Sequence, residues 1–485
     1  MINSKLIYKV IGSLLFLESL FMLICLGVSF LYREEDVLPF LISILLTQFA
    51  AFVLRYKGRE ADNAMSRKDS FLVVTLTWFV FSLFGTLPFM LGGYITNFTN
   101  AFFESMSGFT TTGATILDDV EDLPHGILFW RSLSQWIGGL GIVFFTVAIL
   151  PSMVGGAVKV FAAESTGPIK TKLHPRLTTS TQSLWVIFLI LTIACAITYK
   201  LLGMGWFDCV NYAMTTIATG GFSTHNDSIE FFHSPAMEYM STLFCFLSGT
   251  NFILLYRMVI KRDIKGVFTN YELKCYVGLT LFFSAIIMTL LIVCNHYDLE
   301  RAFRCALYQV VSFITTTGLF NDDAARWPHV TWVILALCMF TGACAGSTSG
   351  GFKCARVTML LKVVRNEFRQ ALHPKAVLPL KIGNVNVSMQ RRVTLLAFLT
   401  TYCLLCIFCA TTMIIAGVDN TNAITITIST LSNVGPTLGT EIGPTMSWDE
   451  LPDFAKWICS LLMLMGRLEI FSVLIIFTPT FWKDR

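Results

Sequence analysis

Four short segments of this chain, spaced roughly 100 residues apart, combine hydroxyl or amide side chains with a glycine. Glycine permits the positive φ angles that line up consecutive backbone carbonyls. Four such backbones arranged in a ring can replace the water around a dehydrated monovalent cation such as K+. We therefore predict an ion filter whose candidate ligands, aligned on the glycine, are Thr111-Thr112-Gly113, Ala218-Thr219-Gly220, Thr316-Thr317-Gly318 and Asn433-Val434-Gly435.

Residues upstream of the four glycines also repeat. At one fixed distance before the glycine, three segments carry alanine and the second carries aspartate: Ala101, Asp208, Ala306 and Ala423. At a shorter fixed distance, three carry serine and the second carries methionine: Ser107, Met214, Ser312 and Ser429. A single Thr-x-Thr-Gly turn is common in ordinary loops, so the prediction depends on this fourfold repetition.

The composition places these segments in a membrane. Of the 485 residues, 54% are hydrophobic and 14% are charged, whereas soluble domains average about 25% charged residues. The small, scattered net charge of +4 does not favour nucleic-acid binding. A spanning helix needs about 20 mostly apolar residues, and ten runs reach that length: Leu6–Tyr32, Val37–Tyr56, Phe71–Leu91, Trp130–Leu150, Ser183–Gly203, Ala236–Val259, Tyr276–Cys294, Trp332–Val364, Val393–Gly417 and Phe454–Phe477.

Shorter, semi-polar segments lie between alternate pairs of these runs: Asn97–Ile116, Trp206–Phe222, Leu299–Phe320 and Thr421–Gly439. We expect each to be a re-entrant helix with an extended return, because irregular backbone at membrane depth must be shielded by protein or line a water-filled path. The predicted fold is an all-α polytopic membrane protein with four tandem helix–pore loop–helix repeats around a pseudo-fourfold pore, plus two extra N-terminal helices. The expected boundaries are 1–69 for the two N-terminal helices, then 70–165, 166–265, 266–380 and 381–485 for the repeats.

The charged residues predict the orientation. Basic residues concentrate in the connections 57–69, 159–176, 257–274 and 353–392, whereas acidic clusters lie on the opposite side at 118–122, 322–323 and 449–453. The positive-inside rule then places the N-terminus in the cytoplasm of a multi-pass protein. The cluster Asp118–Asp122 would concentrate cations at the outer mouth of the pore.

The run Trp332–Val364 is too long for one simple helix, and its middle is rich in glycine and hydroxyl residues. Glycine disfavours helix, and unwound backbone in a membrane is tolerated where it lines a cavity. Arg467 lies at a matching depth in the last run, and an intramembrane arginine is costly. We expect Arg467 to donate hydrogen bonds to carbonyls of this loop and to obstruct cations below the filter. The candidate gating residues are Gly346, Ser347, Gly350, Gly351 and Arg467.

Alternatives exist for the single residues. The loop glycines could instead allow close helix packing, with Arg467 bound to a structural partner. Glu469 is not expected to be that partner, because two residues along a helix do not face each other. Two further acids in apolar surroundings, Glu18 and Glu104, are expected to form hydrogen bonds within the protein rather than to act in function.

Two more stretches complete a family pattern: Gly85-Thr86-Leu87-Pro88-Phe89 and Gln135–Ile142. With the four repeats, they resemble the superfamily of Trk, Ktr and HKT potassium transporters, and the extra N-terminal helices resemble its bacterial TrkH branch. The resemblance covers essentially the whole chain. It implies a potassium uptake protein of the bacterial inner membrane, with K+ as the transported ion and no organic cofactor. It also implies a homodimer with one pore per subunit and a cytosolic nucleotide-binding regulator resembling TrkA, docked on the inner face.

The resemblance also bears on selectivity. Family members with serine in the first filter tend to favour Na+, whereas all four segments keep glycine here, so K+ is expected to be preferred. Ala218 in the second segment and Asn433-Val434 in the fourth depart from fourfold symmetry. These departures leave the strictness of the preference open.

Two other functions are competing interpretations. A secondary transporter of a small solute would bind its substrate near the midplane, but such folds usually have inverted repeats, and these four units share one orientation. A membrane enzyme would need a catalytic constellation, and the sequence contains no HExxH, paired carboxylates or nucleophile motif. The sequence leaves open whether transport is channel-like or coupled to protons or Na+.

Overall fold

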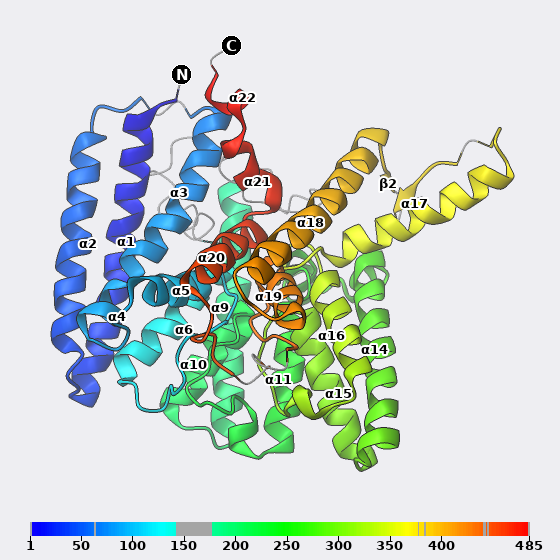
Figure 1. Ribbon diagram of the computed structural model, residues 1–485, viewed down its shortest axis with the longest axis horizontal. Coiled ribbons are helices and arrows are strands. Elements are labelled where there is room, and N and C mark those ends of the chain that lie inside the picture. The colour runs from blue at the N-terminus through cyan, green and yellow to red at the C-terminus, as the bar shows by residue number, and fades with distance from the viewer. Residues whose placement is uncertain are drawn as a thin grey trace.

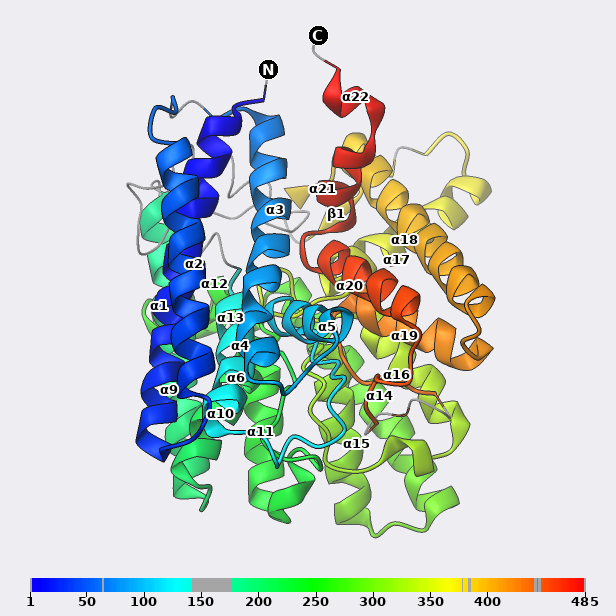
Figure 2. The same ribbon diagram turned by 60° about the vertical axis from the view of Figure 1, so that its left-hand side comes forward.

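The computed structural model describes residues 2–62, 65–141, 177–376, 378–382, 385–439, 443 and 446–483. Helices dominate this part of the chain, and the start of the first helix and the end of the last lie on the same face of the bundle (Figure 1). Helices α1 (Ser4–Tyr32) and α2 (Val37–Lys57) pack together as an N-terminal pair. This pair stands beside α3 at one side of the molecule (Figure 2).

The remaining helices form four units of one plan, in which a long helix leads to a shorter pore helix and then to a returning helix. Unit 1 contains α3 (Arg67–Gly85), α4 (Leu87–Leu91), α5 (Phe98–Phe109) and α6 (His125–Gly139). Unit 2 contains α9 (Leu177–Leu201), α10 (Trp206–Ala218), η1 (Glu230–Phe232), α11 (Pro235–Ser248), α12 (Phe252–Val259) and α13 (Ile264–Phe268). Unit 3 contains α14 (Tyr271–Asn295), α15 (Leu299–Ile314), η2 (Ala324–Arg326), α16 (His329–Thr341) and α17 (Cys354–Leu372). Unit 4 contains α18 (Met389–Ile415), α19 (Asn420–Ser432), α20 (Asp453–Arg467), α21 (Ile470–Leu474), η3 (Ile475–Phe477) and α22 (Pro479–Trp482).

The four units close into a ring. Helix α6 of unit 1 packs against α10 of unit 2, α11 against α15 of unit 3, α16 against α19 of unit 4, and α20 returns to α5 of unit 1. The pore helices α5, α10, α15 and α19 lie inside this ring, and most residues in their C-terminal halves are buried. Because other helices shield them, these short polar helices do not have to cover their surface against lipid. The predicted fold class is confirmed.

The expectation of ten spanning runs is only partly correct. Among the described residues, six helical spans are long and apolar enough to cross a membrane: α1, α2, α3 continued by α4, α9, α14 and α18. The run 236–259 is bent by 105° between α11 and α12, and the run 454–477 is bent by 115° between α20 and the α21–η3 segment. The expectation of one continuous spanning helix is therefore wrong for both runs. The run 130–150 begins within α6, and its part beyond residue 141 lies outside the described residues.

The bends have local causes that hydropathy does not register. After α11, Gly249 and Asn251 interrupt the apolar pattern, and the Asn251 side chain starts α12 by accepting a hydrogen bond from the Ile253 amide at 2.9 Å. After α20, Glu469 has a φ of 59° and is the N-cap residue just before α21. A side-chain cap or a left-handed residue redirects the chain even when its neighbours are apolar.

The predicted break in the third unit is confirmed. Helix α16 ends at Thr341 and α17 begins at Cys354, so residues 342–353 form a loop between two helices. Helix α17 then extends away from the body of the bundle (Figure 1) and leads to the short antiparallel pair β1 (Lys381–Ile382) and β2 (Val385–Asn386).

Candidate ion-binding site

Each pore helix ends in a segment with an unusual backbone. The residue two places before the filter glycine is left-handed in all four units, with φ between 53° and 55°: Thr111, Thr219, Thr316 and Asn433. A β-branched residue with positive φ is a genuine outlier, and each such residue costs of order 1–3 kcal/mol. Three threonines held in this conformation at equivalent positions indicate that the surrounding structure imposes the same backbone path four times.

The glycines complete the path and correct the alignment of the second segment. Positive φ recurs two residues after each left-handed residue, at 81°, 83°, 80° and 99°, in Gly113, Gly221, Gly318 and Gly435. Alignment of the second segment on Gly220 is therefore wrong by one residue. The triplet of unit 2 that matches the other three filter segments is Thr219-Gly220-Gly221. Ala218 lies just before this triplet.

The corrected alignment also removes two apparent departures from symmetry. The hydroxyl residue upstream of the second filter is Thr215 rather than Met214, and its carbonyl accepts a hydrogen bond from the Gly220 amide at 2.8 Å. Equivalent bonds join Thr112 to Ser107, Thr317 to Ser312 and Val434 to Ser429, at 2.8–3.0 Å. Ala218 ends α10 and packs against Gly139, outside the triplet. The remaining departures are Gly220 in unit 2 and Asn433-Val434 in unit 4.

The four segments meet one another in order. A Cβ added to any filter glycine would lie within 3.0 Å of a backbone oxygen of the next segment. The pairs run around the ring and close it: Gly113 with the Gly220 carbonyl, Gly221 with that of Thr317, Gly318 with that of Val434, and Gly435 with that of Thr112. Only glycine fits at these positions, because a side chain would displace a backbone carbonyl of the neighbouring unit.

Side chains form hydrogen bonds that stabilise this backbone. Gln135 of α6 donates from Nε2 to the Gly220 carbonyl at 2.7 Å and accepts from the Phe222 amide at 3.1 Å. A Cβ on Gly220 would collide with the Gln135 amide group. This collision accounts for glycine at the middle position of the second triplet, where the other three units carry a larger residue. Gln135 lies within a stretch that the sequence singled out, although its role in supporting the second segment was not predicted.

Hydroxyl groups brace the first and third segments in the same way. Thr110 and Thr112 share a hydrogen bond of 2.8 Å, and Thr315 and Thr317 share one of 2.7 Å. In unit 4, Asn433 instead donates to the Thr112 hydroxyl at 3.0 Å and to the Met463 carbonyl at 2.9 Å. The asparagine thus joins the fourth segment directly to the first.

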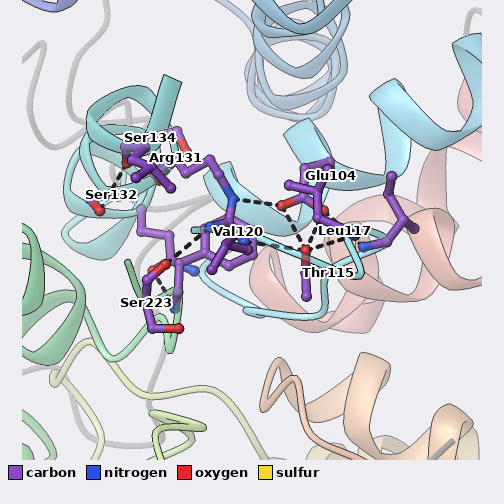
Figure 3. A network of polar contacts seen from close by, with 12 residues as sticks. Glu104, Thr115, Leu117, Val120, Arg131, Ser132, Ser134 and Ser223 are labelled. Atoms are coloured by element: carbon purple, nitrogen blue, oxygen red, sulfur yellow. Dashed lines mark hydrogen bonds and ion pairs between the residues drawn. The ribbon is translucent and has the colours of Figure 1, made fainter. Parts of the chain in front are cut away.

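An open pocket lies above the ring, lined by all four filter glycines and by Asp118. Arg131 also lines it, but its charge is compensated (Figure 3): Nε donates to Glu104 at 2.9 Å, and further bonds go to the Ser223 carbonyl and the Thr115 hydroxyl. Glu104 also accepts from the Ile116 amide at 3.0 Å. The expectation of internal hydrogen bonds is confirmed for Glu104, which anchors the return of the first filter.

The available ligands at the ring are oxygens of the backbone and of hydroxyl side chains. Among the described residues, no group of three or more His, Cys, Asp or Glu side chains could hold a metal ion. Uncharged oxygens in a ring suit a weakly hydrated monovalent cation better than a divalent ion, which prefers carboxylates. The geometry can therefore replace the hydration shell of an alkali cation.

The 342–353 loop lies directly under this ring. The Gly350 amide donates to the Thr316 hydroxyl at 2.7 Å, and a Cβ on Gly350 would lie within 3.0 Å of the Ser432 carbonyl. The Thr348 hydroxyl donates to the Ile217 carbonyl at the end of α10, at 3.2 Å. The loop thus contacts the second, third and fourth filter segments at the ends where the pore helices lead into them.

Arg467 links the same loop to the first unit. Its NH1 donates to the Thr348 carbonyl at 2.9 Å and to the Thr111 hydroxyl at 3.3 Å. Its NH2 donates to the carbonyls of Gly138 and Gly139, both at 2.5 Å, where α6 ends. The predicted hydrogen bond to a loop carbonyl is confirmed, and the additional contacts with the filter and with α6 were not predicted.

The other candidate gating residues shape the loop itself. Gly346 (φ 76°) offers its carbonyl to the Phe252 amide of α12 at 3.0 Å. The Ser347 hydroxyl donates back to the Cys344 carbonyl at 2.7 Å, which tightens the turn. Gly351 (φ 73°) packs against the backbone of Gly342, so the two ends of the loop touch.

Buried and partly buried charged side chains contact the loop or its ends on the side away from the filter ring. Glu272 of α14 accepts a hydrogen bond from the Ala345 amide at 2.6 Å, and the Lys353 ammonium bonds the Ser349 carbonyl. Glu469 pairs with Arg356 of α17 at 2.5 Å. Sequence reasoning missed Glu272 and Arg356, because each contact depends on helices far apart in the chain.

Known proteins share this architecture over nearly the whole chain. The family model described as "TrkH: Cation transport protein" matches residues 39–484. The Trk system potassium uptake protein TrkH of Salmonella typhimurium is 36% identical over 481 residues, with 99% of both chains covered. TrkG of Escherichia coli is 33% identical over 477 residues, covering 98% of this chain and 97% of the relative. The crystal structure of the potassium transporter TrkH from Vibrio parahaemolyticus matches with a TM-score of 0.88 at 35% identity, covering 99% of each chain. The chain belongs to the TrkH family of cation transport proteins, and its resemblance to that family is confirmed.

Proposed function

We propose that this protein takes up K+ through the ring of filter segments, with the ion coordinated by backbone oxygens. The closure of the ring carries the proposal, because each filter glycine abuts a carbonyl of the next unit and the fourth returns to the first. The ligand segments are Thr111–Gly113, Thr219–Gly221, Thr316–Gly318 and Asn433–Gly435. The names of the relatives, which are potassium uptake proteins, support K+ as the transported ion.

Two electrostatic features favour a cation along this path. Four pore helices end at the ring, and the C-terminal end of a helix carries partial negative charge. Asp118 lies in the pocket above the ring and adds negative charge at the entrance. The negative charge therefore attracts a hydrated cation to the entrance. At the ring, the backbone oxygens then offset the free energy that the cation loses with its water.

We propose that the 342–353 loop and Arg467 gate the path. The loop contacts three filter ends, and Arg467 contacts the fourth, so together they occupy the exit below the ring. The guanidinium also places a positive charge where the cation would leave, which raises the barrier further. Opening then requires the loop to move away from the bonds that Arg467 and Glu272 make with it.

The assembly around this pore is part of the same proposal. We propose a homodimer in the bacterial inner membrane with the N-terminus in the cytoplasm. The distribution of basic residues supports this orientation, and the resemblance to the TrkH branch implies the homodimer. A nucleotide-binding regulator resembling TrkA would bind the cytoplasmic face, where the loop could be reached through α17. We also propose that the four repeats occupy residues 70–165, 166–265, 266–380 and 381–485, following the spacing of the filter glycines in the sequence.

Ion flux in proteoliposomes tests the filter. Purified protein is reconstituted, and the rates for K+, Rb+, Na+ and Li+ are compared with and without a proton gradient. The expected order places K+ and Rb+ above Na+ and Li+, since the ring replaces the hydration of the larger ions. Equal rates for all four ions, or transport only of an organic solute, would refute the filter.

Arg467→Ala tests the gate. Loss of even about 1.4 kcal/mol from the closed state increases the open-to-closed ratio tenfold, and the substitution removes several charge-assisted bonds of about 1.5–3 kcal/mol each. We expect at least about a tenfold higher K+ flux, with a smaller increase for Arg467→Lys. Arg326→Ala is the matched control, because that side chain is 83% exposed on the outer side. Unchanged or lower flux in correctly inserted Arg467→Ala protein would reject the gate.

A further inference from the structure

Glu18 does not form the internal hydrogen bonds expected of it. It lies at the middle of α1 and is fully buried, and neither carboxyl oxygen has a hydrogen-bond partner among the described residues. The expectation of internal hydrogen bonds is therefore wrong for Glu18. The contrast is Glu104, equally buried, whose oxygens accept bonds from Arg131, Thr115 and Ile116. The filter and the gate make no use of Glu18.

The Glu18 carboxyl shares a small space with the first pore helix. Gly85, at the end of α3, leaves this space open: a Cβ there would lie 2.5 Å from the Ser105 hydroxyl and 3.6 Å from Glu18 Oε1. Ser105 belongs to α5, which leads into the first filter segment, and its hydroxyl is also buried without a partner. Two unpartnered polar groups thus converge where α1, α3 and α5 meet.

Among the described residues, no charged side chain pairs with Glu18. Helix α1 packs against α2, α3 and α6, and the Gly85 space opens onto α5. The described charged side chains on these elements lie at helix ends or are paired with one another. At helix ends are Lys5 and Lys9 of α1, Asp36, Arg55 and Lys57 of α2, and Arg67, Lys68 and Asp69 of α3. The paired groups are Glu104 with Arg131 and His125 with Glu34. An ionised carboxylate that is fully buried and has no paired cation among the described residues is strongly disfavoured.

We propose that Glu18 is an intramembrane proton-binding site that acts on the first pore helix. The protonated acid is neutral and has an O–H to donate, and the Ser105 hydroxyl is the acceptor within the same space. Loss of the proton would leave a charge in apolar surroundings, so deprotonation requires the contact between α1, α3 and α5 to loosen. Proton occupancy of Glu18 therefore biases the position of α5 and, through it, conduction at Thr111–Gly113. The link to conduction rests on the proposed function, whereas the proton site does not.

Infrared spectroscopy of the purified full-length protein in lipid nanodiscs tests the proton site without transport. The wild type is compared at neutral pH with Glu18→Gln, which keeps the shape of the side chain but has no acid proton. Glu60→Gln is the matched control, because the Glu60 side chain is 65% exposed. The expected result is a carbonyl band of a protonated acid in the wild type and Glu60→Gln that is missing from Glu18→Gln. If Glu18→Gln removes an ionised carboxylate band instead, the proposal is overturned.

The pH dependence of Rb+ flux in proteoliposomes tests the link to conduction. The wild-type rate is expected to change with pH by up to about tenfold per unit, the limit for one titrating group, and the Glu18→Gln rate by less than about twofold over the same range. Glu18→Asp retains an exchangeable proton, so its Rb+ flux should keep the pH dependence of the wild type. This variant provides the test if Glu18→Gln folds poorly. An identical pH profile in wild type and Glu18→Gln would overturn the link. If no variant conducts Rb+, the proposed function fails while the infrared result still decides the proton site.

Discussion

Replacement of Gly221 by alanine tests the geometry of the filter most directly, because sequence alignment and structure disagree there. Gly221 has a φ of 83°, and an alanine in this region costs about 1–2 kcal/mol. Its Cβ would also press on the backbone carbonyl of Thr317, which cannot move without displacing the third segment. Overpacking of this kind costs about 1–3 kcal/mol. The total cost is about 2–5 kcal/mol. This strain disturbs the backbone carbonyls that replace the hydration shell of the ion.

Gly220→Ala is the informative comparison. Gly220 does not have positive φ, and the group that its Cβ would meet is the end of the Gln135 side chain, which can rotate away. The cost is then the loss of about one or two hydrogen bonds of roughly 1 kcal/mol each. Since every 1.4 kcal/mol of relative ion stabilisation is a factor of ten, Gly221→Ala should lower the K+/Na+ permeability ratio at least about tenfold, and Gly220→Ala less than that.

The assay is competition between Rb+ and Na+ in proteoliposomes that contain equal amounts of inserted protein. Gly278→Ala in α14 serves as the control, because no atom lies within 4 Å of the added Cβ. If Gly220→Ala reduced selectivity as much as Gly221→Ala, the structural alignment of the second segment would be refuted. If neither substitution changed selectivity, the backbone ring would not be the filter.

Two further predictions concern the loops around Asn226 and His225. The Asn226 side chain accepts a hydrogen bond from the buried Val120 amide at 3.0 Å, and Asn226→Ala removes this bond. We expect the substitution to lower the free energy of unfolding by about 1 kcal/mol or more, measured by denaturant unfolding of the protein in detergent. An unchanged unfolding midpoint would contradict this. Burial opposes the charge on His225, but the carboxylates of Asp208 at 3.6 Å and Glu121 at 3.4 Å outweigh burial and raise the pKa of His225 above 6.5. The stabilisation is therefore present in full below pH 6.5 and is lost as pH rises through the higher folded-state pKa. Thermal melting of wild type and His225→Gln across this range should converge at high pH, and a constant difference would refute the ion pairs.

The architecture was largely predictable because it depends on properties that are local in the chain. The length of the apolar runs, the fourfold recurrence of glycine after hydroxyl residues and the polar interruption around residues 342–351 are each visible within a short window. Composition alone places such segments in a membrane or against a water-filled path. The same logic identified Arg467, since a cation within an apolar membrane run requires partners whatever the fold.

Contacts between segments distant in sequence decided the rest. Two adjacent glycines gave two possible alignments for the second filter segment, and only the left-handed Thr219 and the approach of Gly221 to the third segment distinguish them. The bend after α20 depends on a left-handed Glu469, which hydropathy does not register. Glu18 could not be recognised as unpaired from sequence, because hydrogen-bond satisfaction is a property of the packed neighbours and not of the residue. The sequence by itself therefore determined which segments enter the membrane and how often the unit repeats, whereas the tertiary structure determined which backbone atoms meet at the ring.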